Sequence, residues 1–310
     1  MKYRSEGAKR KEESITIKSN DYSSEFERKS QESYPMQKSV DKNNINPGEQ
    51  LREFIKKLFP ADVKNDSFIS RIDDLLQADG DLRDLVYNST INYVLRRLIV
   101  TADYFKRKCE KENKGNEKFR TDLRAFLKED MRFPDEKQIG RILVLISDCL
   151  DTRNADVADS TKHEIRKRAR KNSKACYICG GELEFDRGDL YNSVQVEHKW
   201  PKAMGGSSDN FNLEVACQKC NCKKSDYIDA SDFHYEKICL VSDENDRHFS
   251  TEMNREYELA LWAKREFKCS ICGKSAADAG KLKFGRKNPN DSWHFLNIEI
   301  FCEKHHKIRG

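Results

Sequence analysis

The segment Val196-Glu197-His198-Lys199-Trp200-Pro201 lies between two pairs of cysteines that each have Cys-x2-Cys spacing. The pairs are Cys176 with Cys179 and Cys217 with Cys220. Two such pairs a few dozen residues apart are the ligand set of a tetrahedral zinc site, although ordinary buried cysteines and a disulfide framework are the alternatives. The chain shows no secretory signal and is rich in lysine, so we expect a reducing, cytoplasmic environment. The sequence therefore predicts a structural Zn²⁺ site that leaves the acid and the histidine free for chemistry.

The residues between the cysteine pairs predict two strands followed by a helix. Residues 193–198 alternate apolar and polar side chains, as a half-buried strand does. Neighbouring side chains of a strand point to opposite faces, so Glu197 and His198 at its end can perform separate tasks. Proline and glycine punctuate the loop that follows, and residues 211–216 predict the returning strand. The helix is expected to begin at Gln218.

Residues 176–226 resemble the HNH endonuclease family, whose core is a ββα-metal finger, and His198, Asn212 and Asn221 carry the resemblance. The resemblance implies that His198 is the general base that deprotonates a water. It implies that Glu197 and Asn221 bind one Mg²⁺ or Mn²⁺, and that Asn212 orients the histidine or braces the loop. The chain departs from the family pattern at the acid, which is often Asp, and at Asn221, where the family has His. Both variants suit a hard cation held by oxygen ligands.

The resemblance implies a function: metal-dependent hydrolysis of phosphodiester bonds, with double-stranded DNA as the expected substrate. A neutral histidine and a carboxylate-bound cation supply the deprotonated water and the charge stabilisation that this reaction needs. By analogy with members that carry an extra helical module, a role in restriction or phage defence is expected. Two alternatives stay open: a non-catalytic zinc-finger protein that binds nucleic acid, and a nuclease subunit that is silent without a partner.

The C-terminal region repeats this unit in degenerate form. Residues 297–306 align with residues 212–221 without a gap, which places His306 at the position of Asn221. The expected ligands of a second structural Zn²⁺ are Cys269, Cys272, Cys302 and His305. No acid-histidine pair stands where a base would be, a position we assign to residues 281–284. We predict a non-catalytic treble-clef finger that contacts DNA, supports a homodimer or caps the chain. The basic residues available for DNA contact are Lys281, Lys283, Arg286 and Lys287.

A helical module is predicted ahead of the nuclease finger. Apolar residues recur at helical spacing over residues 51–59, 68–76, 82–109, 118–128 and 137–150. The module has no cysteine-histidine or phosphate-loop signature, so we expect it to dock a partner or the DNA, or to act as a scaffold that stabilises the nuclease.

A basic helix is expected between the module and the first finger, over residues 161–174. Thr161 and Glu164 have the spacing of a capping box. Most such runs are solvated faces, but this one leads directly into the first finger, so we expect phosphate contact and steep salt dependence. The residues proposed to contact nucleic acid are Arg166, Lys167, Arg170, Lys171, Lys199 and Lys224.

The length, charge and hydrophobicity of the chain agree with a fold made of several such units. The chain has 310 residues and a net charge of +5, and 36% of its residues are charged. No apolar run is long enough to span a membrane. The expected fold class is α+β, with an all-helical module followed by two zinc fingers. The predicted divisions are a disordered polar tail (1–46), the helical module (47–156), the basic connecting helix (157–175), the nuclease finger (176–226), a helical connector (227–266) and the second finger (267–310).

Overall fold

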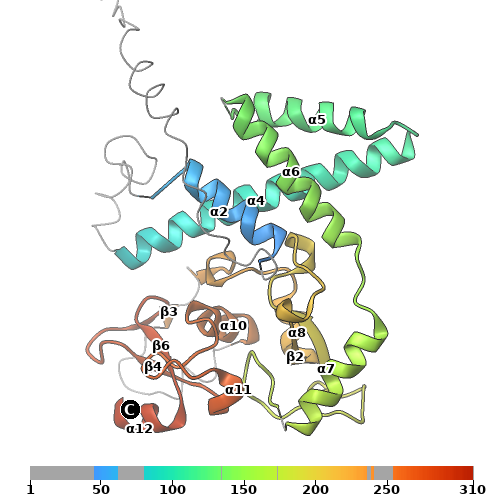
Figure 1. Cartoon of the computed structure of the whole chain (residues 1–310). Coiled ribbons are helices and arrows are strands. Elements are labelled where there is room, and N and C mark those ends of the chain that lie inside the picture. The colour runs from blue at the N-terminus through green and yellow to red at the C-terminus, as the bar shows by residue number, and fades with distance from the viewer. Residues whose placement is uncertain are drawn as a thin grey trace, which may run out of the picture. The chain divides into compact units, whose positions relative to one another are not determined.

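The computed structural model describes residues 45–61, 80–133, 135–172, 174–235, 239–240 and 254–309. Ile45 to Gly310 belong to one compact unit. The fold is α+β: helices dominate, and the strands form small two-stranded sheets, as the sequence predicted (Figure 1). None of the helices in the described ranges is long and apolar enough to cross a membrane.

Four helices form the N-terminal module: α2 (Pro47–Leu58), α4 (Gly80–Lys111), α5 (Asn116–Glu129) and α6 (Glu136–Asn154). They confirm the helices expected from apolar spacing over these stretches, and α2, α4 and α6 pack against one another (Figure 1). The helix predicted over residues 68–76 lies outside the described residues. The aliphatic residues of the core that the four helices share include Leu51, Ile55, Leu95, Ile99, Leu123, Ile142 and Ile146.

The predicted polar tail ends earlier than residue 46, because Asn46 is part of the fold. Asn46 is 3% exposed and is the N-cap of α2. Glu49 closes a capping box with it, and Pro47 occupies the first helical turn, where its missing N–H is not needed. The start of α2 is therefore fixed by local chemistry and by the residues that surround Asn46.

The basic helix is α7 (Asp159–Lys171), and its start differs from the prediction. The N-cap is Ala158, which has no side chain to bond the free N–H groups, and Thr161 lies inside the helix. The expected capping box at Thr161 and Glu164 is therefore wrong. Ile165 and Ala169, four residues apart, are the buried residues of α7 and attach it to the core.

The first finger consists of β1 (Val194–His198), β2 (Leu213–Cys217) and α8 (Gln218–Lys224). The strands are antiparallel, with His198 opposite Leu213. The returning strand begins two residues later than predicted, because residues Asn210–Asn212 form a 3₁₀ turn, η3, in front of it. The helix begins at Gln218, as expected.

The second finger has β4 (Lys283–Arg286) paired antiparallel with β6 (Ile298–Phe301), followed by α12 (Glu303–Arg309). A short helix, α11 (Ala276–Ala279), lies within this finger ahead of β4, and β5 (Trp293–His294) pairs with β3 (Cys239–Leu240). The helix expected in the connector is α10 (Arg255–Lys264). Both fingers, α7 and α10 share one hydrophobic core.

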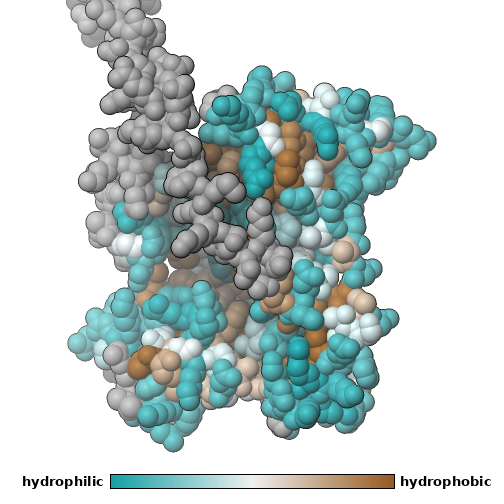
Figure 2. All heavy atoms as spheres, viewed as in Figure 1, coloured by the Kyte–Doolittle hydropathy of each residue, from teal (hydrophilic) through white to brown (hydrophobic). Residues whose placement is uncertain are grey.

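The surface of the helical module carries a groove between α5 and α6. It holds about 490 Å³, and its lining includes the apolar Leu143 and Val144 and the cationic Arg120 and Arg124. Figure 2 shows a brown apolar patch over these two helices on an otherwise mostly teal surface. Docking of a protein partner on this module, expected from the sequence, stays a prediction.

Candidate functional site: a finger held by four cysteines and clamped by the helical module

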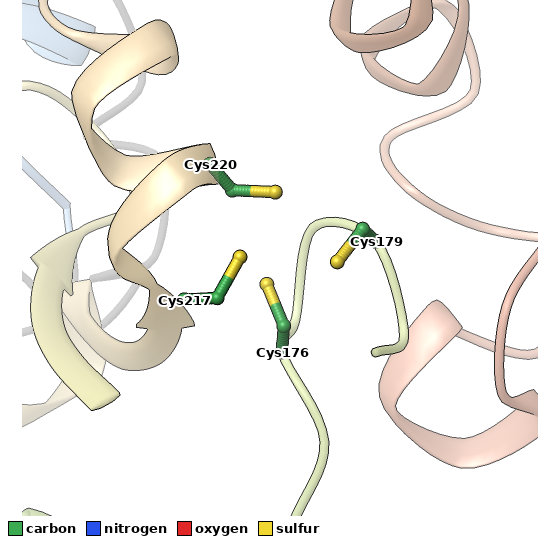
Figure 3. Close-up of side chains that lie close together, drawn as sticks. All are labelled: Cys176, Cys179, Cys217 and Cys220. Atoms are coloured by element: carbon green, nitrogen blue, oxygen red, sulfur yellow. The ribbon is translucent and has the colours of Figure 1, made fainter. Parts of the chain in front are cut away.

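The first cysteine cluster has the geometry that the spacing predicted. Figure 3 shows Cys176 and Cys179 on one loop, Cys217 at the end of β2 and Cys220 on α8, with their sulfurs turned toward a common centre. The four Sγ atoms lie within 4.8 Å of one another and all four residues are buried. Four thiolates at this spacing fit the tetrahedral coordination of zinc. The cluster joins the loop before β1 to the helix after β2 and so fixes the finger.

A side chain that the sequence did not single out contacts this cluster. Arg255 of α10 donates from Nη2 to Sγ of Cys220 at 2.7 Å, and its guanidinium lies 4.8 Å from the ring centroid of Trp262. Burial lowers the pKa of Arg255, but negative charge on the sulfur of Cys220 and on the carboxylate of Glu258 outweighs it, so the net pKa is raised. A permanent positive charge therefore faces the cysteine cluster. The sequence gives little indication of this contact, because 35 residues separate Arg255 from Cys220.

The second cluster contains Cys269, Cys272, Cys302 and His305, whose ligand atoms also lie within 4.8 Å of one another. Three thiolates and one imidazole are a common zinc set, so both predicted clusters could hold zinc. The pairing of β4 with β6, however, corrects the predicted place of the missing base. His198 lies opposite Leu213, and Arg286 lies opposite Ile298, which follows Asn297 as Leu213 follows Asn212. The equivalent position is thus Arg286 rather than residues 281–284.

Glu197 is buried and paired with a lysine. Glu197 lies on β1 and is 8% exposed. Nζ of Lys224 on α8 donates to Oε1 of Glu197 at 2.9 Å and to the carbonyl oxygen of His198 at 3.0 Å. Burial raises the pKa of Glu197, and the charge of Lys224 opposes this rise. Asn221 lies three residues before Lys224 on α8, on the same side of the helix. The carboxylate and the amide expected to bind a metal therefore come from adjacent elements.

The burial of Lys224 corrects one predicted nucleic-acid contact. Lys224 is 4% exposed and its ammonium is engaged within the finger, so this side chain does not face a ligand in solution. The remaining candidates are exposed, four of them on α7 and one directly after β1: Arg166, Lys167, Arg170, Lys171 and Lys199. Arg170 pairs with Asp186 at 2.5 Å, and both side chains are more than half exposed, so this pair contributes little stability.

His198 is half-buried at the end of β1. Its Nε2 lies 3.2 Å from Oγ of Ser208, which donates to the carbonyl oxygen of Ala155 at 3.0 Å. Burial lowers the pKa of His198 from 6.5 to about 4, and the nearby ammonium groups of Lys202 and Lys224 add to this shift. The imidazole is therefore neutral at physiological pH, and a neutral imidazole can accept a proton.

Asn212 braces the loop that joins the two strands. Its Nδ2 donates to the carbonyl oxygens of Trp200 and Ser207 at 3.0 and 2.8 Å, and its Oδ1 accepts from the backbone N–H of Trp200 at 2.7 Å. Asn46 continues this network from the helical module: its Nδ2 donates to Oδ1 of Asn212 at 3.3 Å, and its Oδ1 accepts from the N–H of Ser207 at 2.8 Å. The contacts of Asn212 run to the loop backbone, which fits bracing of the loop.

The braced loop is inserted into the helical module. Trp200 and Met204, from residues 200–206, belong to the core of that module, and Nε1 of Trp200 donates to the carbonyl oxygen of Met204 at 2.8 Å. The N–H of Gly48 on α2 donates to the carbonyl oxygen of Gly205 at 3.1 Å. A Cβ on Gly48 would lie 1.8 Å from that Met204 oxygen, so only glycine permits this approach. Gly205 has φ +77° and packs against Cys149, in a conformation that glycine adopts without strain.

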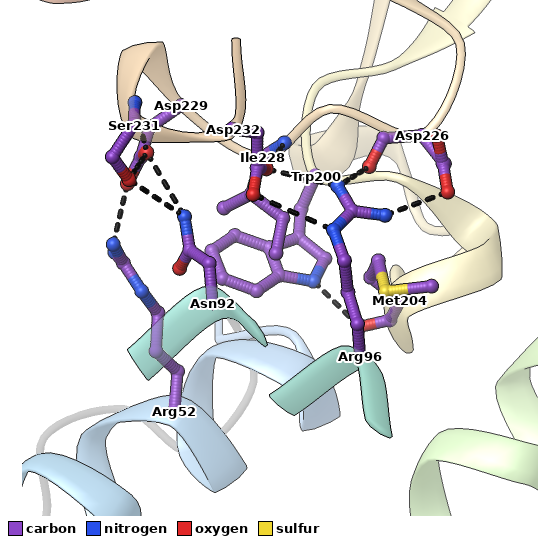
Figure 4. A network of polar contacts seen from close by, with 10 residues as sticks. All are labelled: Arg52, Asn92, Arg96, Trp200, Met204, Asp226, Ile228, Asp229, Ser231 and Asp232. Carbon is purple, nitrogen blue, oxygen red and sulfur yellow. Dashed lines mark hydrogen bonds and ion pairs between the residues drawn. The ribbon is translucent and has the colours of Figure 1, made fainter. Parts of the chain in front are cut away.

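A polar network fixes residues 226–232 against α4 (Figure 4). Arg96 donates to Oδ2 of Asp226 at 2.6 Å and to Oδ2 of Asp232 at 2.9 Å. Asn92 donates to Oδ1 of Asp229 at 3.0 Å, and Arg52 of α2 forms an ion pair with the same carboxylate. The helical module thus holds the segment that follows the finger as well as the loop within it. Helical periodicity predicted α4 but could not show that its polar residues face the finger.

Comparison with known families agrees with this geometry. Residues 176–233 match the model of a family described as HNH endonuclease. The match includes both cysteine pairs, His198 and Asn212, and it leaves the helical module and the second finger outside. This segment is similar to an HNH endonuclease domain, which supports a nuclease-type function in general and binding of nucleic acid. No curated protein and no solved structure matches the chain.

Proposed function

We propose that the chain is a metal-dependent endonuclease that hydrolyses phosphodiester bonds of double-stranded DNA, with His198 as the general base. The observation that carries this proposal is a neutral, half-buried His198 beside the buried carboxylate of Glu197, on a finger closed by four cysteines. A protein that only binds nucleic acid has no need of an acid and a histidine side by side at the end of β1. Strongly shifted groups of this kind concentrate at functional sites.

The donor set fits Mg²⁺ or Mn²⁺. Glu197 offers a carboxylate and Asn221 an amide oxygen, and hard cations prefer oxygen ligands. The ammonium of Lys224 lies 2.9 Å from Oε1 of Glu197, and its charge opposes the rise in the pKa of Glu197 that burial causes. When bound, the cation would stabilise negative charge on the phosphate and on the departing oxygen. The zinc clusters hold the fingers and take no part in the reaction.

The remaining steps are performed by the chain itself. Neutral His198 accepts a proton from a water, and the position of its ring depends on Ser208 and on the strand end. Asn212 keeps the following loop closed, and the helical module fixes that loop from the other side. The exposed cations of α7, with Lys199, are proposed to position the DNA backbone. Action in the cytoplasm and a role in restriction or phage defence complete the proposal.

The test is cleavage of supercoiled plasmid by the purified protein with Mg²⁺, Mn²⁺ or EDTA. Replacement of a general base lowers the rate by about 10²–10⁴-fold, so His198→Ala should remove cutting at ordinary enzyme concentrations. His163→Ala is the matched control, because His163 is exposed on α7 and is not part of the finger. Equal cutting by His198→Ala and His163→Ala would contradict the assignment of the base.

The alternative function is non-catalytic binding of nucleic acid. It predicts no cutting with either metal, together with retained binding by His198→Ala. A nuclease that needs a partner predicts the same silence in isolation but cutting after co-purification with that partner.

A further inference from the structure

The second finger reproduces hydrogen bonds of the first, including those of the loop that follows the proposed base. The N–H of Lys287 donates to the carbonyl oxygen of Asn297 at 2.7 Å, as Lys199 does to Asn212 at 2.7 Å. Nδ2 of Asn297 donates to the carbonyl oxygens of Asn288 and Ser292 at 3.1 and 2.8 Å. Its Oδ1 accepts from the N–H of Asn288 at 2.8 Å, so Asn297 braces its loop in the way that Asn212 does.

The cysteine loops also match. Gly180 and Gly273 have φ +65° and +67°, and each donates its N–H to the first cysteine of its pair, at 2.8 and 2.9 Å. The repeat is therefore a copy of the whole nuclease finger with a shorter loop, rather than a cysteine knuckle alone. This equivalence makes it meaningful to ask which residues occupy the positions of the acid and the base.

Those positions are occupied by Gly285 and Arg286. In β4, Gly285 lies opposite Glu299 as Glu197 lies opposite Glu214 in β1, and Arg286 takes the place of His198. The second finger thus has a glycine, without a side chain, in place of the acid, and a permanently charged arginine in place of the neutral histidine. A negative charge is lost and a positive charge is gained at the same place in the fold. An arginine cannot accept a proton at neutral pH, so this finger cannot activate a water as the first one is proposed to do.

The replacement of the acid is built into the packing. A Cβ on Gly285 would lie 2.9 Å from Cε2 of the buried Phe301, so an aromatic ring covers the place that an acidic side chain would need. An apolar ring next to this position disfavours a bound metal. Of the two positions that correspond to the acid and the base, only that of Arg286 then carries a charged side chain. The second finger is therefore adapted to a task without metal-assisted hydrolysis.

Arg286 is held in an orientation suited to an anionic ligand. Its guanidinium lies 5.2 Å from the ring centroid of Trp293, and Nη1 donates to the carbonyl oxygen of Asp291 at 3.0 Å. A guanidinium has five N–H donors, and this contact uses one. The acidic side chains of this finger have partners: Asp291 lies 3.0 Å from Nε2 of His294, Glu299 forms an ion pair with Arg265, and Glu303 forms one with Lys283 at 2.6 Å. Residues 280–310 contain seven Lys or Arg against three acids.

We propose that Arg286 binds a backbone phosphate of the nucleic acid at the place that corresponds to the hydrolytic site of the first finger. The second finger would then hold the substrate without cutting it. Arginine binds phosphate oxygens through paired, charge-assisted hydrogen bonds, and a guanidinium fixed on an aromatic ring loses little freedom on binding. The inference rests on the proposed function only in that the ligand is nucleic acid. It assigns a non-hydrolytic phosphate site outside the matched domain.

The experiment measures binding of a short labelled DNA duplex by fluorescence anisotropy, in a His198→Ala background and without added divalent cation. Arg286→Ala should weaken binding by about ten- to a hundredfold, the size of one charge-assisted contact. The slope of log K against log salt, between about 50 and 200 mM, should fall by about 0.9 for the lost phosphate contact. Arg286→Lys should restore the slope, because the charge returns. Arg107→Ala on α4 is the control for loss of an exposed arginine outside both fingers.

Zinc content and thermal melting show whether each variant is folded. If Arg286→Ala unfolds the second finger, Arg286→Gln keeps a planar group over Trp293 and takes its place in the assay. Affinity and salt slope equal to those of Arg107→Ala would overturn the proposal, and so would a wild-type chain that binds no duplex. A change of oligomeric state with an unchanged slope would instead assign this face to self-association and also overturn it.

The outcomes separate this inference from the proposed function. Cutting that depends on His198, together with unaltered binding by Arg286→Ala, removes the phosphate site alone. Weakened binding by Arg286→Ala, in a protein that never cuts, removes the catalytic proposal alone.

Discussion

Replacement of Gly48 by alanine tests whether the helical module holds the nuclease loop in place. The added Cβ would lie 1.8 Å from the carbonyl oxygen of Met204 and 2.5 Å from Nε1 of Trp200. Neither distance is tolerable, so α2 or the loop must move. The movement separates the indole N–H of Trp200 from the Met204 oxygen, which it contacts at 2.8 Å.

The magnitude follows from three effects. Overpacking of a close contact costs about 1–3 kcal/mol, and a buried N–H left without its acceptor costs about 1–3 kcal/mol more. The alanine recovers about 0.5–1 kcal/mol, because glycine is a poor helix former. The free energy of unfolding should therefore fall by about 2–4 kcal/mol. For a chain of this size, at about 2–4 °C for each kcal/mol, the melting temperature should fall by about 5–15 °C.

The assay pairs this variant with Gly140→Ala. Gly140 lies inside α6, and a Cβ there meets no atom within 4 Å, so the same substitution should stabilise the protein by about 0.5–1 kcal/mol. Denaturant unfolding and thermal melting give the two stabilities. Plasmid cutting well below both melting temperatures shows whether the moved loop also impairs the site, since this loop follows His198 directly.

Equal stabilities of Gly48→Ala and Gly140→Ala would refute the reasoning, because the added methyl group meets close contacts only at Gly48. Normal cutting by a destabilised Gly48→Ala would separate the two claims. The module would then stabilise the loop without positioning the end of β1 that carries the proposed base.

Three further predictions concern the zinc cluster, the base and the polar network. Cys176→Ser should reduce bound zinc from two equivalents to one, because three thiolates and a hydroxyl bind zinc poorly. Elemental analysis measures the zinc, and two retained equivalents would contradict the assignment. Burial lowers the pKa of His198 to about 4, since it disfavours the charged imidazole, so the proposed base is neutral above pH 5. The rise of kcat/KM with pH should therefore lie below pH 5. A midpoint near pH 6.5 would refute the lowered pKa. Arg96→Ala leaves the buried Asp232 and its neighbour Asp226 without their partner and should lower the free energy of unfolding by about 2–3 kcal/mol. Arg96→Lys should recover less than half of that loss, because an ammonium cannot bond both carboxylates in a fork, and full recovery in a denaturant titration would contradict this.

The sequence alone determined the local units. Cysteine spacing predicted both clusters, because a tetrahedral zinc set requires few and specific separations along the chain. Alternation of side chains predicted β1, and apolar spacing predicted α4, α5 and α6, because strand and helix periods depend on neighbours in the chain.

Other expectations failed where distant residues decide the outcome. The place of the missing base was assigned to residues 281–284, but strand pairing puts Arg286 there, since the loop to Asn297 is shorter than the loop to Asn212. Lys224 looked like a phosphate contact, yet its ammonium is buried against Glu197. A residue's charge is visible in the sequence, but the direction in which it points is set by packing.

Only the tertiary structure showed how the helical module and the finger depend on each other. Asn46 precedes Asn212 by 166 residues, and Trp200 is buried in the core of helices that precede it in the chain. No periodicity or motif encodes such a contact, because it arises from shape and burial among segments far apart in sequence. A short motif therefore predicted the cysteine cluster and the two strands of the finger, whereas the contacts that hold this finger in place depend on the fold of the whole unit.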